Sequence, residues 1–208
     1  MKLVLASNNA KKLTELRTLL NGLDIDLVAQ GALGVTEAEE PHPSFVENAL
    51  AKARHAAHAT GLAAVADDSG LCVDVLGGAP GVASAVYAPA PTAQGEREAQ
   101  RRAQDAANNA LLLDKMQGVL DRRCRFVSTL VALRSPDDPE PLIAFGRWHA
   151  TLLAAPRGGG GFGYDPLVWI ASERASVAEL DAQVKNRISH RALAAARLRE
   201  LLRETWRL

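Results

Sequence analysis

Residues 63–75 read Ala-Ala-Val-Ala-Asp-Asp-Ser-Gly-Leu-Cys-Val-Asp-Val, and this stretch decides the fold class. Its first part, residues 63–66, is a short apolar run that is typical of a buried strand. The next four residues, Asp67 to Gly70, are expected to separate this strand from a second one over residues 71–75. The stretch therefore predicts a buried strand that brings two adjacent carboxylates to the mouth of a sheet.

Helical patterns lie on the N-terminal side of this strand. Residues 3–6 form a short apolar run, and leucines at helical spacing follow between residues 13 and 20. Ser44 and Glu47 form a capping box, which predicts a helix that continues to about Thr60 and ends at Gly61. Strands and helices thus alternate irregularly, which favours a single α/β domain over residues 1–208 with a mixed sheet.

The rest of the chain shows the same mixture without internal repeats or a long linker. Strands are expected at residues 25–29, 126–133 and 142–153, and an acidic loop at 31–43. Helices are expected at residues 92–116, as one helix or a pair, and from about 189 to 204, and Ser176 to Glu179 are expected to cap a further short helix.

Composition excludes several classes of protein. Lysine and arginine total 24 and aspartate and glutamate 24 in 208 residues, so we expect no nucleic-acid partner. No apolar run approaches the ~20 residues that a membrane span needs, and the N-terminal run is too short for a secretory signal. Cys72 and Cys124 lie in separate apolar runs, which favours buried free thiols. We therefore expect a cytoplasmic protein with no membrane contact.

Adjacent carboxylates at the end of a buried strand require compensation. Asp67 and Asp68 are costly to bury unless a cation or hydrogen-bond donors neutralise them. Mg²⁺ is suited to this role because it takes one or two carboxylates together with substrate phosphates. Glu39 and Glu40, in the acidic loop, are candidates for a further metal ligand. The alternative interpretation is an ordinary acidic turn and a solvated loop.

A polar cluster between the first strand and the first helix is a candidate phosphate site. It consists of Ser7, Asn8, Asn9, Ala10, Lys11 and Lys12. A helix start presents unpaired N–H groups and a positive dipole end, and Lys12 adds a charge that polyphosphate can use. The alternative is an ordinary helix cap beside solvated lysines.

Two segments in the C-terminal half are candidates for base recognition. A glycine tract leads into Phe162, Gly163, Tyr164 and Asp165, which offer rings for stacking and a carboxylate that can accept from a ring N–H. Basic side chains cluster around the start of the last helix: Lys185, His190 and Arg191. The alternatives are a flexible loop with core aromatics and an exposed, positively charged helix cap.

Taken in order, these segments resemble the inosine triphosphate pyrophosphatase family, whose members act on non-standard purine nucleotides. The resemblance extends over essentially the whole chain. The matching blocks are Ala6–Lys12, Phe45–Ala49, Ala66–Leu71, Leu76–Val82, Gly161–Pro166 and Ile188–Arg191.

The resemblance implies an elongated mixed sheet with flanking helices and two lobes around a central nucleotide cleft. It also implies a homodimer and Mg²⁺-dependent hydrolysis of ITP, XTP or their deoxy forms to the monophosphate and pyrophosphate. Asp68 corresponds to the proton acceptor and metal ligand and Glu39 to a second metal ligand. Whether Asp68 acts as a base or through the metal stays open at this point.

The resemblance further assigns residues to the substrate. Ser7 to Lys12 correspond to the triphosphate-binding turn and Ser69 to a substrate contact. The base-recognition set corresponds to Phe162, Gly163, Tyr164, Asp165, Lys185, His190 and Arg191. An Arg191 donor at O6 and an Asp165 acceptor at N1–H would disfavour adenine, since both groups would be left unpaired against it.

One departure from the family pattern is Val86, which stands where an arginine is common. Two other functions remain as alternatives. One is a pyrophosphatase of the same fold for other modified or pyrimidine nucleotides, and the other is a nucleotide-binding module without catalysis. The adjacent acids argue against the second, because binding alone does not need them.

Overall fold

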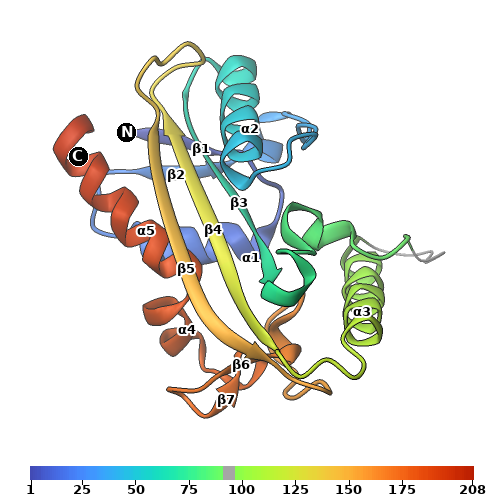
Figure 1. Ribbon diagram of the computed structural model, residues 1–208. Coiled ribbons are helices and arrows are strands. Elements are labelled where there is room, and N and C mark those ends of the chain that lie inside the picture. Colours follow the sequence, from blue (N-terminus) through green and yellow to red (C-terminus); the bar gives the residue numbers. More distant parts are fainter. Residues whose placement is uncertain (91–96) are drawn as a thin grey trace. The chain divides into compact units, whose positions relative to one another are not determined.

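The structure, a computed structural model, describes residues 1–90 and 97–208 (Figure 1). Its strands are β1 (Lys2–Leu5), β2 (Asp26–Ala29), β3 (Ala63–Val73), β4 (Arg123–Leu133), β5 (Leu142–Leu152), β6 (Val168–Ile170) and β7 (Ala175–Ser176). Its α-helices are α1 (Ala10–Leu19), α2 (Phe45–Thr60), α3 (Arg97–Lys115), α4 (Ala182–Ile188) and α5 (His190–Leu201). Short 3-10 helices and a π-helical end at Leu202–Trp206 complete the described elements.

The strands form one mixed sheet in the order β2-β1-β3-β4-β5-β6-β7. β1 is parallel to both β2 and β3, whereas β6 is antiparallel to β5 and β7. The predicted α/β class with a mixed sheet and flanking helices is therefore confirmed. The chain divides into two compact units, so the prediction of a single domain, and of a cleft between lobes, stays a prediction.

Unit 1 comprises Met1–Ser69, Ser128–Arg147 and Asn186–Leu208. Its strands bury both faces, because alternate side chains of a strand point to opposite sides. Leu3 and Leu5 of β1 pack with residues of α1 and α5, while Val4 packs against the alanine face of α2. The alanines of α2 let the helix lie close to the sheet, and a layer of helix covers each face (Figure 1).

Gly146 of β5 lies directly against the backbone of α5. A Cβ atom built on this glycine would lie 1.9 Å from the backbone oxygen of His190 and 2.6 Å from the backbone nitrogen of Ala194. No side chain can be accommodated there, since backbone atoms cannot move aside as a flexible side chain can. The absence of a side chain thus fixes where the first turn of α5 lies.

Unit 2 comprises Gly70–Val127 and Trp148–Lys185. It contains α3, the strands β6 and β7, and the ends of β3, β4 and β5 that lie beyond unit 1. The predicted cap at Ser176 is confirmed: Ser176 and Glu179 form a capping box on a single 3-10 turn. Cys72 and Cys124 are both free and buried, as predicted, and burial raises the pKa of Cys124 to about 12.

Several predicted elements are confirmed and others are wrong. Ser44 caps α2 as predicted, since its side chain accepts from the backbone N–H of Glu47, and Gly61 ends the helix in a left-handed conformation. The predicted break at Asp67–Gly70 is wrong, because β3 runs without interruption through these residues. The predicted helix over residues 92–116 is observed from Arg97, and its first part lies outside the described residues.

The C-terminal helices also differ from the sequence prediction. Lys185 does not belong to the last helix, since α4 contains it and Ser189 caps a separate helix α5. Leu193 of α5 is 43% exposed and so does not belong to the buried face of that helix. In the part of the chain that the structure describes, no helix combines the length and apolar character required to cross a membrane.

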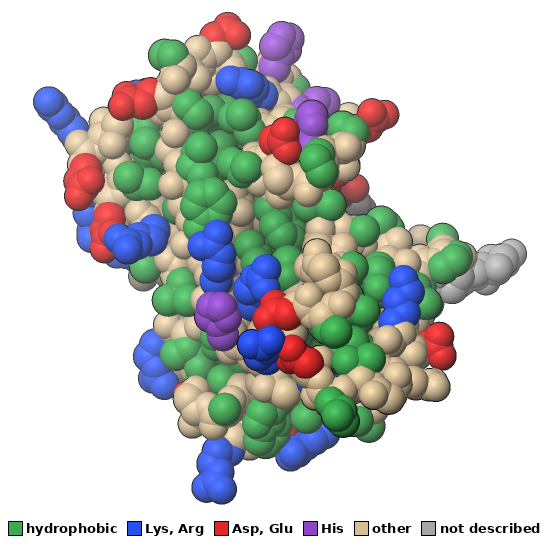
Figure 2. Space-filling model, viewed as in Figure 1, with side chains coloured by type: hydrophobic (Ala, Val, Ile, Leu, Met, Phe, Trp, Pro, Cys, Tyr) green, Lys and Arg blue, Asp and Glu red, His purple; other side chains and the backbone are tan. Residues whose placement is uncertain are grey.

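The sheet exposes one apolar strip within unit 1. β5 alternates buried and exposed residues, and its outward side chains include Ile143 and Phe145. Figure 2 shows hydrophobic side chains gathered over this part of the sheet. Arg147 lies over the ring of Phe145, with its guanidinium carbon 5.7 Å from the ring centre.

Candidate active site

Strand β3 carries Asp67 and Asp68 on its opposite faces, because neighbouring residues of a strand alternate sides. The strand can pass Gly70 only because this residue lacks a side chain. A Cβ atom there would lie 2.4 Å from the oxygen of Gly81 and from Oγ of Ser84. The acids thus lie inside a strand, and cationic partners from helices compensate them on each side.

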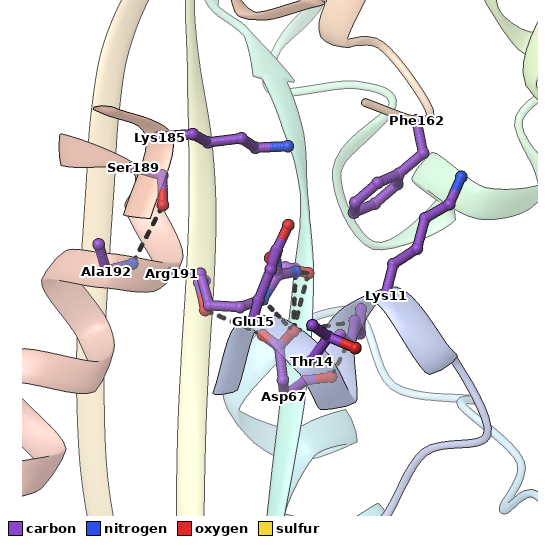
Figure 3. A network of polar contacts seen from close by, with 12 residues as sticks. Lys11, Thr14, Glu15, Asp67, Phe162, Lys185, Ser189, Arg191 and Ala192 are labelled. Carbon is purple, nitrogen blue, oxygen red and sulfur yellow. Dashed lines mark hydrogen bonds and ion pairs between the residues drawn. The ribbon is translucent and has the colours of Figure 1, made fainter. Parts of the chain in front are cut away.

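Asp67 is enclosed by hydrogen-bond donors of unit 1. Arg191 donates from Nε to Oδ2 of Asp67 at 2.9 Å, and Ser128 donates from Oγ to Oδ1 at 2.9 Å. The Lys12 ammonium lies 3.2 Å from Oδ2. Figure 3 shows Arg191 and Glu15 beside Asp67, with dashed lines marking the contacts. The side chain of Asp67 is completely buried, and it depends on these partners for its charge.

The cations hold Asp67 in its ionised form. Burial by itself would raise its pKa, but the attraction of Arg191 and then Lys12, together with the Ser128 hydrogen bond, outweighs burial. The pKa of Asp67 therefore lies well below its usual range. For Lys12 the balance is reversed, since burial lowers its pKa more than Asp67 raises it. Asp67 is thus a fixed negative charge rather than a proton carrier at neutral pH.

Asp68 has a different environment on the other face. Lys52 of α2 donates to Oδ1 of Asp68 at 2.8 Å, and the same ammonium lies 3.3 Å from Oε2 of Glu40. Oδ2 of Asp68 is buried and has no hydrogen-bond partner within the described residues. A buried carboxylate oxygen without a donor is unfavourable, so this atom is available to a ligand or a cation.

Burial raises the pKa of Asp68 to about 6, although Lys52 opposes the shift. Burial would also lower the pKa of Lys52, but Asp68 and then Glu40 outweigh this effect and raise it. Lys52 therefore remains a cation beside Asp68. A carboxyl group whose pKa approaches neutrality can exchange a proton under physiological conditions, which is a requirement for a general base.

The residues around Asp68 fit a weakly coordinated Mg²⁺ ion. Among residues 1–90 and 97–208, no three His, Cys, Asp or Glu side chains converge as a ready-made metal cage. Mg²⁺ commonly binds through one or two carboxylates and takes its other ligands from phosphates and water. The unpartnered Oδ2 of Asp68 fits that pattern. Glu39 is exposed, and its role as a second ligand stays a prediction.

The predicted phosphate turn forms in unit 1 at the start of α1, where Ala10 is the first helical residue. Asn9 caps the helix, and its side chain accepts from the backbone N–H groups of Lys11 and Lys12. Ser7 accepts from the backbone of Asn9 at 3.2 Å. Oδ1 of Asn8 is buried without a partner among the described residues. The turn thus has a defined conformation, with Lys12 already directed at Asp67.

The aromatic loop and Lys185 come together in unit 2. Oδ2 of Asp165 accepts from the backbone N–H of Phe162 at 3.0 Å and from the Lys185 ammonium at 2.8 Å. The same ammonium lies 4.8 Å from the centre of the Phe162 ring. Both Asp165 and Tyr164 are buried, and the Tyr164 hydroxyl donates to the oxygen of Ser84 at 2.9 Å. The predicted recognition segment therefore has internal structure of its own.

The remaining predicted residues lie in unit 1. Ser69 accepts from Nη2 of Arg191 at 3.1 Å, and Arg191 also forms an ion pair with Glu15. His190 and Arg191 are both buried in the first turn of α5. Arg191 is thus bound to three partners inside the protein, and its predicted contact with the purine O6 stays a prediction.

The structure adds residues that the sequence interpretation missed. Lys52 faces the sheet from the same stripe of α2 as the buried alanines 49, 53 and 56, and a lysine within an apolar stripe is a signal that could have identified it. Glu15 of α1 pairs with Arg191, and its place in the sequence gives no sign of this contact. For Ser128, inside an apolar strand, no comparable signal exists. Glu40, which the sequence had already suggested as a possible ligand beside Glu39, pairs with Lys52.

Comparisons with known proteins agree over the full length of the chain. The sequence model of the Ham1 family matches residues 3–201. A dITP/XTP pyrophosphatase of Methylibium petroleiphilum is 65% identical over 99% of both chains, and one of Leptothrix cholodnii is 63% identical over 100% of both.

Solved structures give the same result. A HAM1 protein from Coxiella burnetii, 40% identical, matches with a TM-score of 0.86 over 99% of this chain and 100% of its own. The Staphylococcus aureus Ham1 protein, 32% identical, matches with a TM-score of 0.82 over 98% of this chain and 99% of its own. Because both sequence and fold agree from end to end, this chain belongs to the Ham1 family.

Proposed function

We propose that this protein hydrolyses non-standard purine nucleoside triphosphates, such as dITP and XTP, to the monophosphate and pyrophosphate. The observation that carries the proposal is the environment of Asp68, a buried carboxylate with one oxygen on Lys52 and the other without a partner among residues 1–90 and 97–208. This arrangement lies in a chain that is 65% identical to a dITP/XTP pyrophosphatase. The relatives argue against a module that only binds nucleotides.

The reaction breaks the bond between the α-phosphorus atom and the oxygen that bridges it to the β-phosphorus atom. A water molecule supplies the new oxygen, one of its protons must leave, and pyrophosphate departs. Asp68, whose pKa is raised to about 6, is the group that orients this water or accepts its proton. Lys52 and Lys12 contribute positive charge toward the phosphates.

Mg²⁺, when bound at Asp68, would neutralise charge on the leaving pyrophosphate. Glu39 is the second carboxylate that we assign to it, and the neighbouring Glu40 offers a matched control. We expect Glu39→Gln to raise the Mg²⁺ concentration for half-maximal activity more than Glu40→Gln does. The opposite order would assign the ligand to Glu40. Metal binding by calorimetry with MgCl₂ provides a readout that does not depend on turnover.

Base recognition is assigned to the loop from Phe162 to Asp165, together with Lys185, His190 and Arg191. The Phe162 ring can stack on a purine, and Lys185 is a buried donor next to it. A donor directed at O6 favours hypoxanthine and xanthine over adenine, since an amine at C6 would leave the donor unpaired.

A substrate panel tests the proposed function. Initial rates on dITP, XTP, GTP, ATP and dTTP would be measured by pyrophosphate release, with and without Mg²⁺. We expect the highest kcat/KM for dITP and XTP, and no pyrophosphate without the metal. A preference for dTTP would instead favour a pyrophosphatase of the same fold for other nucleotides.

We also infer a homodimer, for which the exposed apolar strip of β5 is a candidate surface. Ile143 and Phe145 are 37% and 44% exposed, and apolar strips of this kind are frequently covered by a partner. Light scattering on the wild type and on Phe145→Glu would test this. A dimer that persists unchanged in the variant would place the interface elsewhere.

A cytoplasmic location is the last part of the proposal. The buried free thiols of Cys72 and Cys124 are typical of a reducing compartment, which supports it. Cell fractionation followed by immunodetection would test the location directly. Recovery of the protein outside the cytoplasmic fraction would contradict it.

A further inference from the structure

Helix α3 holds the backbone of the recognition loop at Gly163. Oδ2 of Asp105 accepts from the Gly163 N–H at 2.8 Å, and Nδ2 of Asn109 donates to the Gly163 oxygen at 3.0 Å. Asp105 and Asn109 are four residues apart, so they project from the same face of the helix. The N–H belongs to the peptide group before Gly163 and the oxygen to the one after it. Both peptide planes that flank this residue are therefore fixed.

The same face of α3 also fixes Tyr164, through an intermediate segment. Asn108 donates to the backbone oxygens of Ser84 and Ala85 at 3.2 and 3.1 Å, and it accepts from the backbone of Ala88 at 2.8 Å. The Tyr164 hydroxyl donates to the same Ser84 oxygen. Asn108 is buried, so these hydrogen bonds are shielded from water and hold the tyrosine ring at a defined position.

The loop depends on these hydrogen bonds because its own sequence does not restrict its backbone conformation. Gly161 and Gly163 both have positive φ angles, of 74° and 61°. Glycine adopts such angles without strain, but it adopts negative φ angles about as readily, so the sequence does not select this conformation. A glycine-rich segment left to itself would sample many conformations, and a ligand that selects one of them would bind more weakly. Fixed peptide planes at Gly163 hold the adjoining Phe162 ring and the Asp165 carboxylate in one arrangement.

We propose that Asp105 and Asn109 are positioning residues that set the purine selectivity of this enzyme without touching the substrate. The proposal rests on the proposed function, since it takes the loop from Phe162 to Asp165 to be the base site. In this role α3 preorganises the loop, and loss of either brace weakens binding of the base while leaving the phosphate site of unit 1 intact.

The test compares Asp105→Ala, Asn109→Ala and the conservative variant Asp105→Asn, which keeps an acceptor oxygen. One hydrogen bond corresponds to about a fivefold change in an equilibrium constant. We expect each alanine variant to raise KM for dITP about fivefold, to lower the dITP-to-dATP ratio of kcat/KM, and to leave kcat within about twofold. The KM of Asp105→Asn for dITP should stay close to that of the wild type. Asp114→Ala, an exposed aspartate on the same helix, is the matched control.

Inhibition by tripolyphosphate separates a positioning role from a general loss of structure. This probe has no base, so its inhibition constant should be the same in wild type and alanine variants. A lower melting temperature with unchanged KM and unchanged discrimination would overturn the proposal and leave α3 as a structural element only. Equal weakening of dITP and tripolyphosphate would also overturn it. If the wild type did not prefer dITP, the proposed function would fail instead, and the same variants would be measured on its actual substrate.

Discussion

The two faces of β3 show how neighbouring aspartates acquire different roles. On one face Asp67 is surrounded by Arg191, Lys12 and the Ser128 hydroxyl. On the other, Asp68 has Lys52 on one oxygen and, among the residues that the structure describes, no partner on the second. Both residues are aspartates and they are adjacent in sequence, so the difference comes from what the neighbouring helices and strand β4 bring to each face.

This difference separates stability from chemistry. A carboxylate whose hydrogen bonds are all made within the protein contributes to folding but cannot readily take part in a reaction. A carboxylate with a raised pKa and an unpartnered oxygen is unfavourable for folding, yet it is ready for a ligand. We therefore expect substitutions on the two faces to have different consequences.

The largest effect is expected for Asp68→Asn. Because the amide can neither accept a proton nor bind Mg²⁺ strongly, kcat/KM for dITP should fall by about 10² to 10⁴-fold. The thermal melting temperature should stay close to that of the wild type, since burial disfavours the charge of Asp68, and in the variant the amide oxygen can still accept from Lys52, which also keeps Glu40. Pyrophosphate release and calorimetry check the two parts. A variant that retained most of its activity would remove Asp68 from the chemistry.

Asp67→Asn should act mainly on folding. The buried Arg191 would lose a charged partner and keep Glu15, and loss of one member of a buried ion pair typically costs about 3–5 kcal/mol. Urea unfolding of the variant and the wild type would measure the difference in free energy of unfolding. A difference below about 1 kcal/mol would show that the network around Asp67 contributes little to stability.

Low pH should remove the contribution of the Asp67 charge to the free energy of unfolding. The pKa of Asp67 is lower in the folded state than in the unfolded chain, so its stabilisation is fully present above about pH 4. It decreases as the pH falls below the unfolded pKa toward the folded one. The difference in unfolding free energy between wild type and Asp67→Asn should therefore narrow between pH 5 and pH 2 (approximate bounds). A difference independent of pH would contradict this assignment.

The smallest effect is expected for Ser128→Ala, which removes one neutral donor from Asp67 and leaves both cations in place. The loss should be about 1 kcal/mol in unfolding free energy, with kcat for dITP unchanged. Parallel urea unfolding and rate measurements check both values. A loss of activity larger than the loss of stability would connect the Asp67 face to the chemistry after all.

Much of the fold was predictable from sequence because its signals are local. The helix cap at Ser44, the glycine at 61 and the apolar run at residues 63–66 each depend on neighbouring residues, and all appear as predicted. The predicted break at Asp67 failed for the opposite reason. Its acidic residues favour turns locally, but Lys12, Arg191 and Lys52, distant in sequence, compensate them within the strand.

The site was predictable to a similar degree. Motifs suggested Asp68 and the turn at residues 7–12 as candidates, whereas the partners that distinguish Asp68 from Asp67 come from α2 and α5. No local pattern indicates that Glu15 faces Arg191, because such a pairing depends on how two helices pack on one sheet. Short motifs therefore indicate the candidate residues, while tertiary contacts determine the charges that surround them.

Gly146 has a consequence for how this site can vary. Adding a single methyl group to β5 at this residue would push the backbone of His190 outward, and the guanidinium of Arg191 would be carried with it. Its hydrogen bond to Asp67 is 2.9 Å long and tolerates little displacement. A residue that touches no substrate thus limits which sequences can keep the charge arrangement around β3, and any change at Gly146 requires a compensating shift of the whole of α5.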